Sequence, residues 1–217
     1  MEGSYKIVYE GGTGEVVEKK SRFIASVFSV ESEEMAAEFI EKTKKQYWDA
    51  RHNCYAYVIG ADGGRQKCSD DGEPQGTAGR PMLDVLLNEQ IRNILVIVTR
   101  YFGGTLLGTG GLVRAYSMAA KAGIDASRIV TKCPASRIRI ITDYNGVGKL
   151  QYIAAQAQIA VLDTEYTDKV TMTLLVPDGS MHSLKNKVME ATSAAARIED
   201  DGKVWYTILE DKSIHLF

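Results

Sequence analysis

The sequence predicts an α+β protein of two domains, residues 1–134 and 135–217, and three observations lead to this prediction. The first is the run ILVIV at 94–98, which is apolar and mostly β-branched, as in a strand buried on both faces. The second is the helical spacing of the apolar residues after the glycine-rich stretch that follows this run. The third is the order β-α-β-β-α-β beyond Pro134, which is typical of a ferredoxin-like domain.

The composition is that of an ordinary globular protein. Of the 217 residues 45% are apolar and 25% are charged, and the net charge of −2 gives no global reason to bind nucleic acid or a membrane. The three cysteines are too few and too scattered for a disulfide framework, and their odd number indicates reduced thiols. The beginning of the chain lacks the pattern of a signal peptide, and no apolar run is long enough to span a bilayer. We therefore expect a cytoplasmic protein that makes no membrane contact.

The first elements of the chain are expected to be strands and one helix. Residues 5–10 and 15–28 are predicted strands around a hairpin-like turn at 11–14, with a cluster of basic residues at the start of the third strand. Ser32 can cap a helix that carries acidic residues in its first turn and lysines in its last turn, as the helix dipole favours. A further strand is predicted at 53–59.

Residues 61–80 are predicted to form one long polar loop, and loops of this length in compact domains are usually functional or disordered. Asp70, Asp71 and Glu73 lie together in it, and one or two carboxylates with a substrate phosphate are enough for a magnesium site. The alternative is that the Asp-Gly and Glu-Pro pairs are ordinary turn chemistry. A short amphipathic helix with Pro81 at its start is predicted to follow.

His52 and Cys54 are two residues apart, so their side chains share a face in an extended chain. A Cys/His nucleophilic pair is conceivable on that basis. However, side chains two apart on one strand stand side by side along it, which is a poor geometry for proton transfer. We therefore expect His52 to be a polar group at the rim of a pocket.

The stretch from Arg100 to Tyr116 places five glycines between the buried strand and the helix. Glycine allows close approach of a partner to the backbone, and a helix start presents unpaired N–H groups that favour anions. The alternative is tight packing at a strand–helix corner. No standard nucleotide loop is present, because Thr109 and Gly110 stand where a P-loop needs Lys and Ser or Thr, and Val113 takes the third glycine position of a dinucleotide fingerprint.

A strand is predicted at 128–133 and is expected to end at Pro134, after which a new series of strands and helices begins. The second domain is then expected to contain strands at 137–142, 159–166, 170–176 and 203–209 and helices capped by Asp143 and Ser180. Neither domain is basic overall, so a nucleic-acid contact would have to use a local patch. The natural members of such a patch, near the glycines, are Arg80, Arg100, Arg114 and Lys121.

The segments HNCYAYVI (52–59), SDDGEPQGTAGRPMLDVL (69–86) and NILVIVTRYFGGTLLGTGGLVRAYSMAA (93–120) resemble the Impact family in its bacterial YigZ-type form. The resemblance implies a first domain similar to the second domain of ribosomal protein S5, a fold also seen in elongation factor G. It implies a second domain similar to the last domain of that factor. Eukaryotic members regulate translation by binding a ribosome-associated activator and so restraining the kinase that shuts down initiation. The family offers no catalytic residues to carry over.

We therefore expect a regulator of translation that docks to the ribosome, RNA or a translation-associated factor through the glycine-rich turn at 103–111, with no cofactor, metal or catalytic residue. The candidate partner- or anion-binding residues are His52, Asp70, Asp71, Glu73, Arg80, Arg100, Gly103, Gly104, Gly110, Gly111 and Arg114. One alternative is an enzyme acting on a phosphorylated or carboxylated small molecule between the 69–80 loop and the 109–121 helix. Another is a protein–protein adaptor in which the glycine turn is purely structural.

Overall fold

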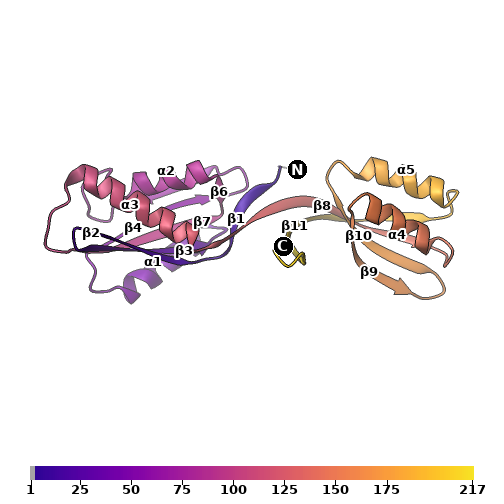
Figure 1. Cartoon of the computed structure of the whole chain (residues 1–217), viewed down its shortest axis with the longest axis horizontal. Coiled ribbons are helices and arrows are strands. Elements are labelled where there is room, and N and C mark those ends of the chain that lie inside the picture. The colour runs from indigo at the N-terminus through magenta and orange to yellow at the C-terminus, as the bar shows by residue number, and fades with distance from the viewer. Residues whose placement is uncertain (1–2) are drawn as a thin grey trace. The chain divides into compact units, whose positions relative to one another are not determined.

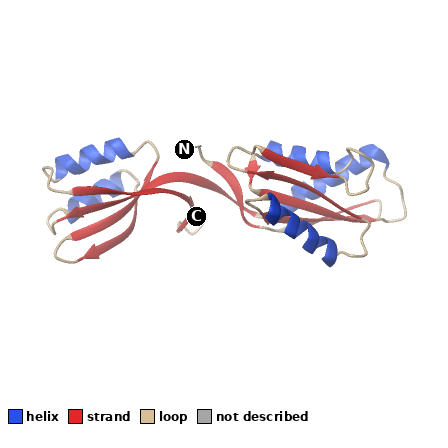
Figure 2. Ribbon diagram, turned by 180° about the vertical axis from the view of Figure 1, so that it is seen from behind, coloured by secondary structure: helices blue, strands red, loops and turns tan. Residues whose placement is uncertain are grey.

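The structure is a computed structural model that describes residues 3–217. The chain forms two compact units, one of residues 4–131 and one of residues 132–217, and each unit has its own hydrophobic core. Both units combine helices with antiparallel strands (Figure 2), so the predicted α+β class is confirmed.

The first unit is built on a five-stranded antiparallel sheet. In spatial order its strands are β2 (Thr13–Glu18), β3 (Ser21–Ser29), β7 (Ile94–Tyr101), β4 (His52–Ile59) and β5 (Arg65–Ser69). The central strand β7 is fully buried from Ile94 to Val98. This burial confirms the prediction that the apolar run is a strand covered on both faces.

Three helices cover the two faces of this sheet (Figure 1). One face packs against α1 (Glu33–Gln46), and the other packs against α2 (Gly79–Glu89) and α3 (Gly108–Asp125). Successive side chains of a strand point to opposite faces. Leu95 therefore joins the core on the α1 side, whereas Val96 joins the core on the α2 and α3 side.

The helix α1 begins as its sequence predicts. The Ser32 side chain accepts a hydrogen bond from the Met35 N–H at 3.2 Å, which satisfies one of the unpaired donors of the first turn. Acidic residues occupy the first turn and lysines occupy the last turn, so both ends complement the helix dipole. The cap and the charge order predicted from the sequence are confirmed.

The hairpin predicted at 11–14 is wrong. The strand β1 (Tyr5–Glu10) pairs in parallel with β6 (Ile91–Arg92), and the hairpin instead joins β2 to β3. Its two turn residues, Lys19 and Lys20, have φ angles of 45° and 67°. A two-residue type I′ turn requires positive φ at both positions. Lysine gives no sequence signal for that conformation, whereas the glycines at 11–14 do, and the sequence therefore predicts the turn at the wrong place.

The long loop predicted at 61–80 contains a strand. β5 pairs with β4 in an antiparallel register that sets Arg65 opposite Ile59. It lies at an edge of the sheet and is mostly exposed, so it lacks the alternation of apolar residues from which strands are predicted. Pro81 lies in the first turn of α2, as expected.

The second unit has the ferredoxin-like order of elements. Its strands run β9-β10-β8-β11-β12 across the sheet, and both helices lie on one side of it (Figure 2). Its elements are β8 (Arg128–Thr142), α4 (Val147–Gln156), β9 (Ala160–Tyr166), β10 (Val170–Pro177), α5 (Met181–Ala191), β11 (Arg197–Ile208) and β12 (Ile214–Leu216). The predicted β-α-β-β-α-β order is confirmed, and β12 is an addition to it.

The strand β8 continues through Pro134, so the two strands expected at 128–133 and 137–142 are a single element. Proline cannot donate to a strand ladder, which confines it to positions where one side is unpaired. Pro134 lies opposite Trp205 of β11, while the pairing with β10 begins only at Ala135. The expected interruption is absent because the proline sits at the end of one ladder.

Candidate functional site

Asp70 caps the helix α2 from the preceding turn. Its Oδ1 accepts the N–H groups of Ala78 at 3.0 Å and Gly79 at 2.8 Å, and its Oδ2 accepts that of Gly76 at 2.8 Å. Burial raises the pKa of Asp70, but these three donors outweigh it, and the pKa lies below its ordinary value. Both carboxylate oxygens are therefore occupied by backbone groups that begin α2.

Asp71 joins the same turn to α1 and β4. Its Oδ1 pairs with Nζ of Lys44 at 2.9 Å, and its Oδ2 accepts the Asn53 N–H at 2.7 Å. The hydrogen bond to Asp71 raises the pKa of Lys44. The Asp71 carbonyl oxygen lies 2.9 Å from Nδ1 of His52. A carbonyl can only accept, so this contact places the imidazole proton on Nδ1.

Glu73 is bound inside the unit by Arg100 and Tyr116. Its Oε1 accepts hydrogen bonds from Nη1 of Arg100 at 2.6 Å and from the Tyr116 hydroxyl at 2.8 Å. The side chains of Glu73 and Arg100 are only 3% and 8% exposed. Burial raises the pKa of Tyr116, so its hydroxyl stays protonated and donates. This cluster ties the turn to the end of β7 and to the middle of α3.

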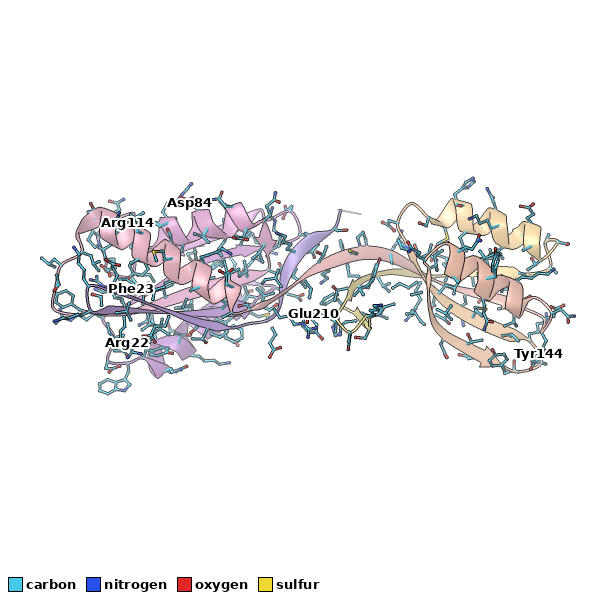
Figure 3. The ribbon with its side chains drawn as sticks, viewed as in Figure 1. Arg22, Phe23, Asp84, Arg114, Tyr144 and Glu210 are labelled. Carbon is cyan, nitrogen blue, oxygen red and sulfur yellow. The ribbon has the colours of Figure 1, made fainter. Side chains whose placement is uncertain are left out.

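The Arg100 guanidinium lies between two aromatic rings, 5.4 Å from the centroid of Phe23 and 5.7 Å from that of Phe102. In the sheet Arg100 is directly paired with Phe23 on one side and His52 on the other. Figure 3 shows Phe23 and its exposed neighbour Arg22 on opposite sides of β3. The Nε atom of Arg100 is buried and has no hydrogen-bond partner within residues 3–217.

Cys54 is a buried packing residue. Its Sγ donates to the carbonyl oxygen of Asp70 at 2.9 Å and lies 3.3 Å from the Tyr116 hydroxyl. Burial raises the pKa of the Cys54 thiol, which disfavours the thiolate needed for nucleophilic attack. His52 binds Asp71 through its Nδ1. Cys54 is therefore engaged in the packing around Asp70 and Tyr116, and His52 is engaged with Asp71.

Packing requires glycine at position 103 and leaves little room for a side chain at position 111. A Cβ on Gly103 would lie 2.0 Å from the backbone carbonyl carbon of Lys20, and the Gly103 N–H donates to Oγ of Ser21 at 3.1 Å. A Cβ on Gly111 would lie 3.2 Å from Cβ of Leu107. Gly103 in particular allows the chain after β7 to cross the β2–β3 turn at close range.

The other glycines of the turn face open space. A Cβ on Gly104, Gly108 or Gly110 would have no heavy atom within 4 Å among the described residues. Gly104 and Gly108 have φ angles of +84° and +70°, a conformation that itself favours glycine. Gly110 lies in the first turn of α3 without a positive φ. Neither packing nor conformation within the described chain therefore accounts for Gly110.

Arg80 and Arg114 lie outside the buried cluster. Arg80 pairs with Asp84 one turn along α2, at 2.8 Å, and both side chains are largely exposed. Arg114 is exposed on α3, on the side of the sheet where Asp84 of α2 also lies (Figure 3). The structure thus brings together Glu73 and Arg100 in one cluster with the neighbouring Asp71 and His52, and leaves these two arginines on the helical surface.

A cavity of about 350 Å³ opens beside Arg100. Its walls are formed by Asp49, Arg51, His52, Arg100, Tyr101, Phe102 and Leu106. Phe102 and Leu106 are 54% and 83% exposed and lie close together in the chain, so they add apolar surface to the cavity. The lining therefore combines cationic groups with apolar groups.

Comparison with known proteins supplies the family. The family model described as the Impact N-terminal domain matches residues 19–124, and one described as a domain of unknown function, DUF1949, matches residues 140–195. The chain is 38% identical over 203 residues to the IMPACT family member YvyE of Bacillus subtilis (strain 168), covering 94% of this chain and 93% of that protein. The chain belongs to the Impact family.

Two further similarities cover most of this Impact family chain. It is 32% identical over 182 residues to the IMPACT family member YigZ of Escherichia coli (strain K12), covering 83% of this chain and 89% of that protein. It also resembles a solved structure titled as that of a hypothetical protein, with a TM-score of 0.60 and 30% identity. That match covers 91% of this chain and 97% of the other. Both domains of the Impact family architecture are therefore present.

The Impact family chain has neither a preformed metal cluster nor a membrane helix in the part that the structure describes. Across residues 3–217, the His, Cys, Asp and Glu side chains do not assemble any group of three or more suited to a metal ion. Within the same range, every helix is too short or too polar to cross a bilayer.

Sequence reasoning missed several residues around Arg100 in this Impact family member. The contact between the Tyr116 hydroxyl and Glu73 has no signal in the sequence. Phe102, Leu106 and Arg51 line the cavity but were not among the candidates. A signal did exist for the first two, since large apolar residues inside a glycine-rich turn have no obvious place in a core.

Proposed function

We propose that this protein is a regulator of translation that acts by binding: it docks to the ribosome, to RNA or to a translation-associated factor through the glycine-rich turn at 103–111. Membership of the Impact family supports the general role, because the family includes the eukaryotic regulators of translation named above. Function cannot be inferred from similarity of fold alone, so the proposal depends on the groups that the glycine-rich turn exposes for binding.

The observation that carries the proposal is the open surface at Gly110 in a segment that also exposes Arg114, Phe102 and Leu106, which distinguishes it from other open glycines. A glycine in a helix is less stable than an alanine by about 0.5–1 kcal/mol. At Gly110 an added Cβ would meet no heavy atom of the described chain, so neither the core nor the turn gains from the glycine. A partner whose backbone or phosphate lies directly on this first helical turn would gain from it, because a methyl group there would hold that partner away.

The surroundings of Gly110 suit such a contact. The N-cap residue of α3, Leu107, makes no side-chain capping hydrogen bond to the first turn of the helix. The N–H groups of that turn are therefore left for an acceptor from outside. Arg114 adds an exposed cation on the next turn of the same helix. Phe102 and Leu106 add exposed apolar surface at the beginning of the loop.

The alternative, an enzyme acting on a small anion, finds less support. The carboxylate turn and α3 do lie side by side, as such a site would require, since Glu73 contacts Tyr116. However, Asp70 is occupied by the start of α2, Asp71 by Lys44 and Asn53, and Glu73 by Arg100. Carboxylates engaged in this way serve the fold, so we favour binding over catalysis.

The test is co-sedimentation of the purified protein with 70S ribosomes, at low and at high salt, for the wild type and for Gly110→Ala. We expect Gly110→Ala to raise the stability of the protein by about 0.5–1 kcal/mol and to weaken co-sedimentation. Loss of binding at high salt would indicate contacts with RNA phosphates, whereas retention would indicate a protein partner.

A matched control is Gly148→Ala. Gly148 also lies in the first turn of a helix, α4, and an added Cβ there would likewise meet no heavy atom of the described chain. This variant should gain similar stability and bind as the wild type does. Unchanged co-sedimentation of both Gly110→Ala and Arg114→Ala would exclude the turn as the docking surface. Absence of co-sedimentation by the wild type at both salt concentrations would count against ribosome docking altogether.

A further inference from the structure

The cavity beside Arg100 contains a buried donor that lacks an acceptor. Nη1 of Arg100 is used by Glu73 at 2.6 Å, whereas its Nε is buried and unpartnered within residues 3–217. Buried polar groups in native proteins are nearly always hydrogen-bonded, and an exception calls for an explanation. Arg100 lines a cavity of about 350 Å³, which is large enough for a side-chain-sized group to enter. Because Nε itself is covered, such a group supplies the missing acceptor only when the Arg100 guanidinium shifts toward the cavity.

The chemistry of the free edge points to a carboxylate. In a guanidinium the Nε–H and one Nη2–H point in the same direction, and a carboxylate binds this edge with two parallel hydrogen bonds. Glu73 occupies Nη1 and so leaves this edge unused by its own carboxylate. Arg51, which is exposed and lines the same cavity, adds a second positive charge to it.

The charges around the cavity favour a single acidic group over a polyanion. Asp49 also lines the cavity, where it accepts a hydrogen bond from the Tyr101 hydroxyl at 2.7 Å, and its charge would repel a chain of phosphates more strongly than a single carboxylate. Two of the nearby cations are already paired, Lys44 with Asp71 at 2.9 Å and Arg22 with Glu15 at 2.8 Å.

The rim of the cavity is apolar. Phe102 and Leu106 are 54% and 83% exposed and stand at its mouth. Such surface is buried favourably by apolar side chains of a partner, and aromatic residues are enriched at the centres of protein interfaces. An acidic side chain with an apolar neighbour would therefore match both parts of the site.

We propose that this cavity receives the carboxylate of an acidic side chain that lies beside an apolar residue in an exposed segment of a protein partner. The proposal rests on the proposed function and deepens it, since it makes the translation-associated partner a protein and states the chemistry of its contact. Arg100 and Arg51 bind the carboxylate, and Phe102 and Leu106 pack against the apolar neighbour.

The test is a nuclear magnetic resonance titration of the full-length protein, labelled with ¹⁵N, that follows the Nε–H signal of Arg100. The probe is the peptide acetyl-Leu-Glu-Leu-amide, and the reference is the same peptide with Gln in place of Glu. We expect the acidic peptide to shift the Arg100 signal, whereas the Gln peptide leaves it in place. Equal shifts with both peptides, or no shift at millimolar acidic peptide, would overturn the proposal.

Two variants sharpen the titration. Arg51→Ala should weaken binding of the acidic peptide about threefold, as expected for loss of one exposed ion pair. Arg65→Ala is the matched control, because Arg65 is an exposed arginine paired with Ile59, at the opposite end of β4 from His52. Equal weakening by both variants would show only a general charge effect and would contradict a contact at Arg51.

A hexanucleotide of uridine separates the proposal from RNA binding. If this RNA shifts the Arg100 signal at lower concentration than the acidic peptide does, the cavity serves nucleic acid and the proposal fails. Failure of the proposed function is distinguishable, because co-sedimentation with ribosomes is measured separately. If the protein binds the peptide but does not co-sediment with ribosomes, the carboxylate site stands and docking to the ribosome is excluded. If it co-sediments but does not bind the peptide, docking stands and the carboxylate site is excluded.

Discussion

Glu73 accepts a hydrogen bond from Nη1 of Arg100 at 2.6 Å, although 27 positions separate the two residues in the chain. Their side chains are 3% and 8% exposed, so the pair lies inside the first unit. Two residues that the sequence assigned to separate roles, a carboxylate for a metal or proton and an arginine for an anion, therefore neutralise each other.

Removing one partner of this pair should destabilise the protein strongly. We expect Glu73→Gln to lower the free energy of unfolding by about 3–5 kcal/mol, because it leaves the Arg100 charge buried without compensation. The double variant Glu73→Gln with Arg100→Met should be less destabilised than the two single variants added together. Urea denaturation of the four proteins measures this coupling. Strict additivity would show that the two side chains do not interact energetically.

The capping role of Asp70 predicts a dependence on pH. Its pKa in the folded protein lies below the ordinary value, so its stabilisation is complete above the unfolded pKa of about 3.9 and is lost as the pH falls through the folded pKa. Asp70→Asn should be less stable than the wild type by about 1 kcal/mol at pH 7. Urea denaturation at pH 7, 5 and 3 should show this difference shrinking at pH 3. A difference that is the same at every pH would argue against a charged cap.

Gly103 should not tolerate a side chain. The Cβ of Gly103→Ala would lie 2.0 Å from the Lys20 carbonyl carbon and 2.3 Å from the Ser21 backbone nitrogen, and neither backbone atom can move aside as a side chain could. We expect a loss of at least about 2 kcal/mol in the free energy of unfolding, through displacement of the β2–β3 turn. Thermal denaturation measures the loss. Wild-type stability in this variant would mean that the turn is not held against Gly103.

The turn at Lys19 and Lys20 can be improved. Both residues have positive φ, which Asn and Gly adopt more readily than lysine. Replacing them by Lys19→Asn and Lys20→Gly should raise the free energy of unfolding by about 0.5–1 kcal/mol. As a control, Asn and Gly are introduced at positions 212 and 213, where only Lys212 has a positive φ. The free energy of unfolding of this control should rise less.

Local patterns predicted most of the fold. The apolar run of β7 and the cap and charge order of α1 depend on residues close in sequence, so the sequence was sufficient for both. The strand β5 was missed because Arg65–Ser69 is an exposed edge, whose conformation is imposed by pairing with β4. The β2–β3 turn was missed because lysine carries no information about positive φ.

The candidate site was less predictable for a related reason. The sequence identified the carboxylates and arginines by type, but the contacts of Arg100 with Phe23 and with Glu73, both distant in sequence, decide what Arg100 does. Which glycines pack against the chain and which face open space likewise depends on tertiary structure. The distinction between Gly103 and Gly110 appears only once the β2–β3 turn and α3 are placed.

The buried pair of Glu73 and Arg100 also constrains how this sequence can change over generations. An apolar pair of similar volume could be as stable as the present pair, but replacing the pair takes two substitutions. Whichever comes first leaves the opposite charge buried without a partner. Selection against this unstable intermediate disfavours losing either Glu73 or Arg100 first. A lineage that has acquired this pair is therefore expected to retain it by historical entrenchment, independently of any partner that the neighbouring cavity binds.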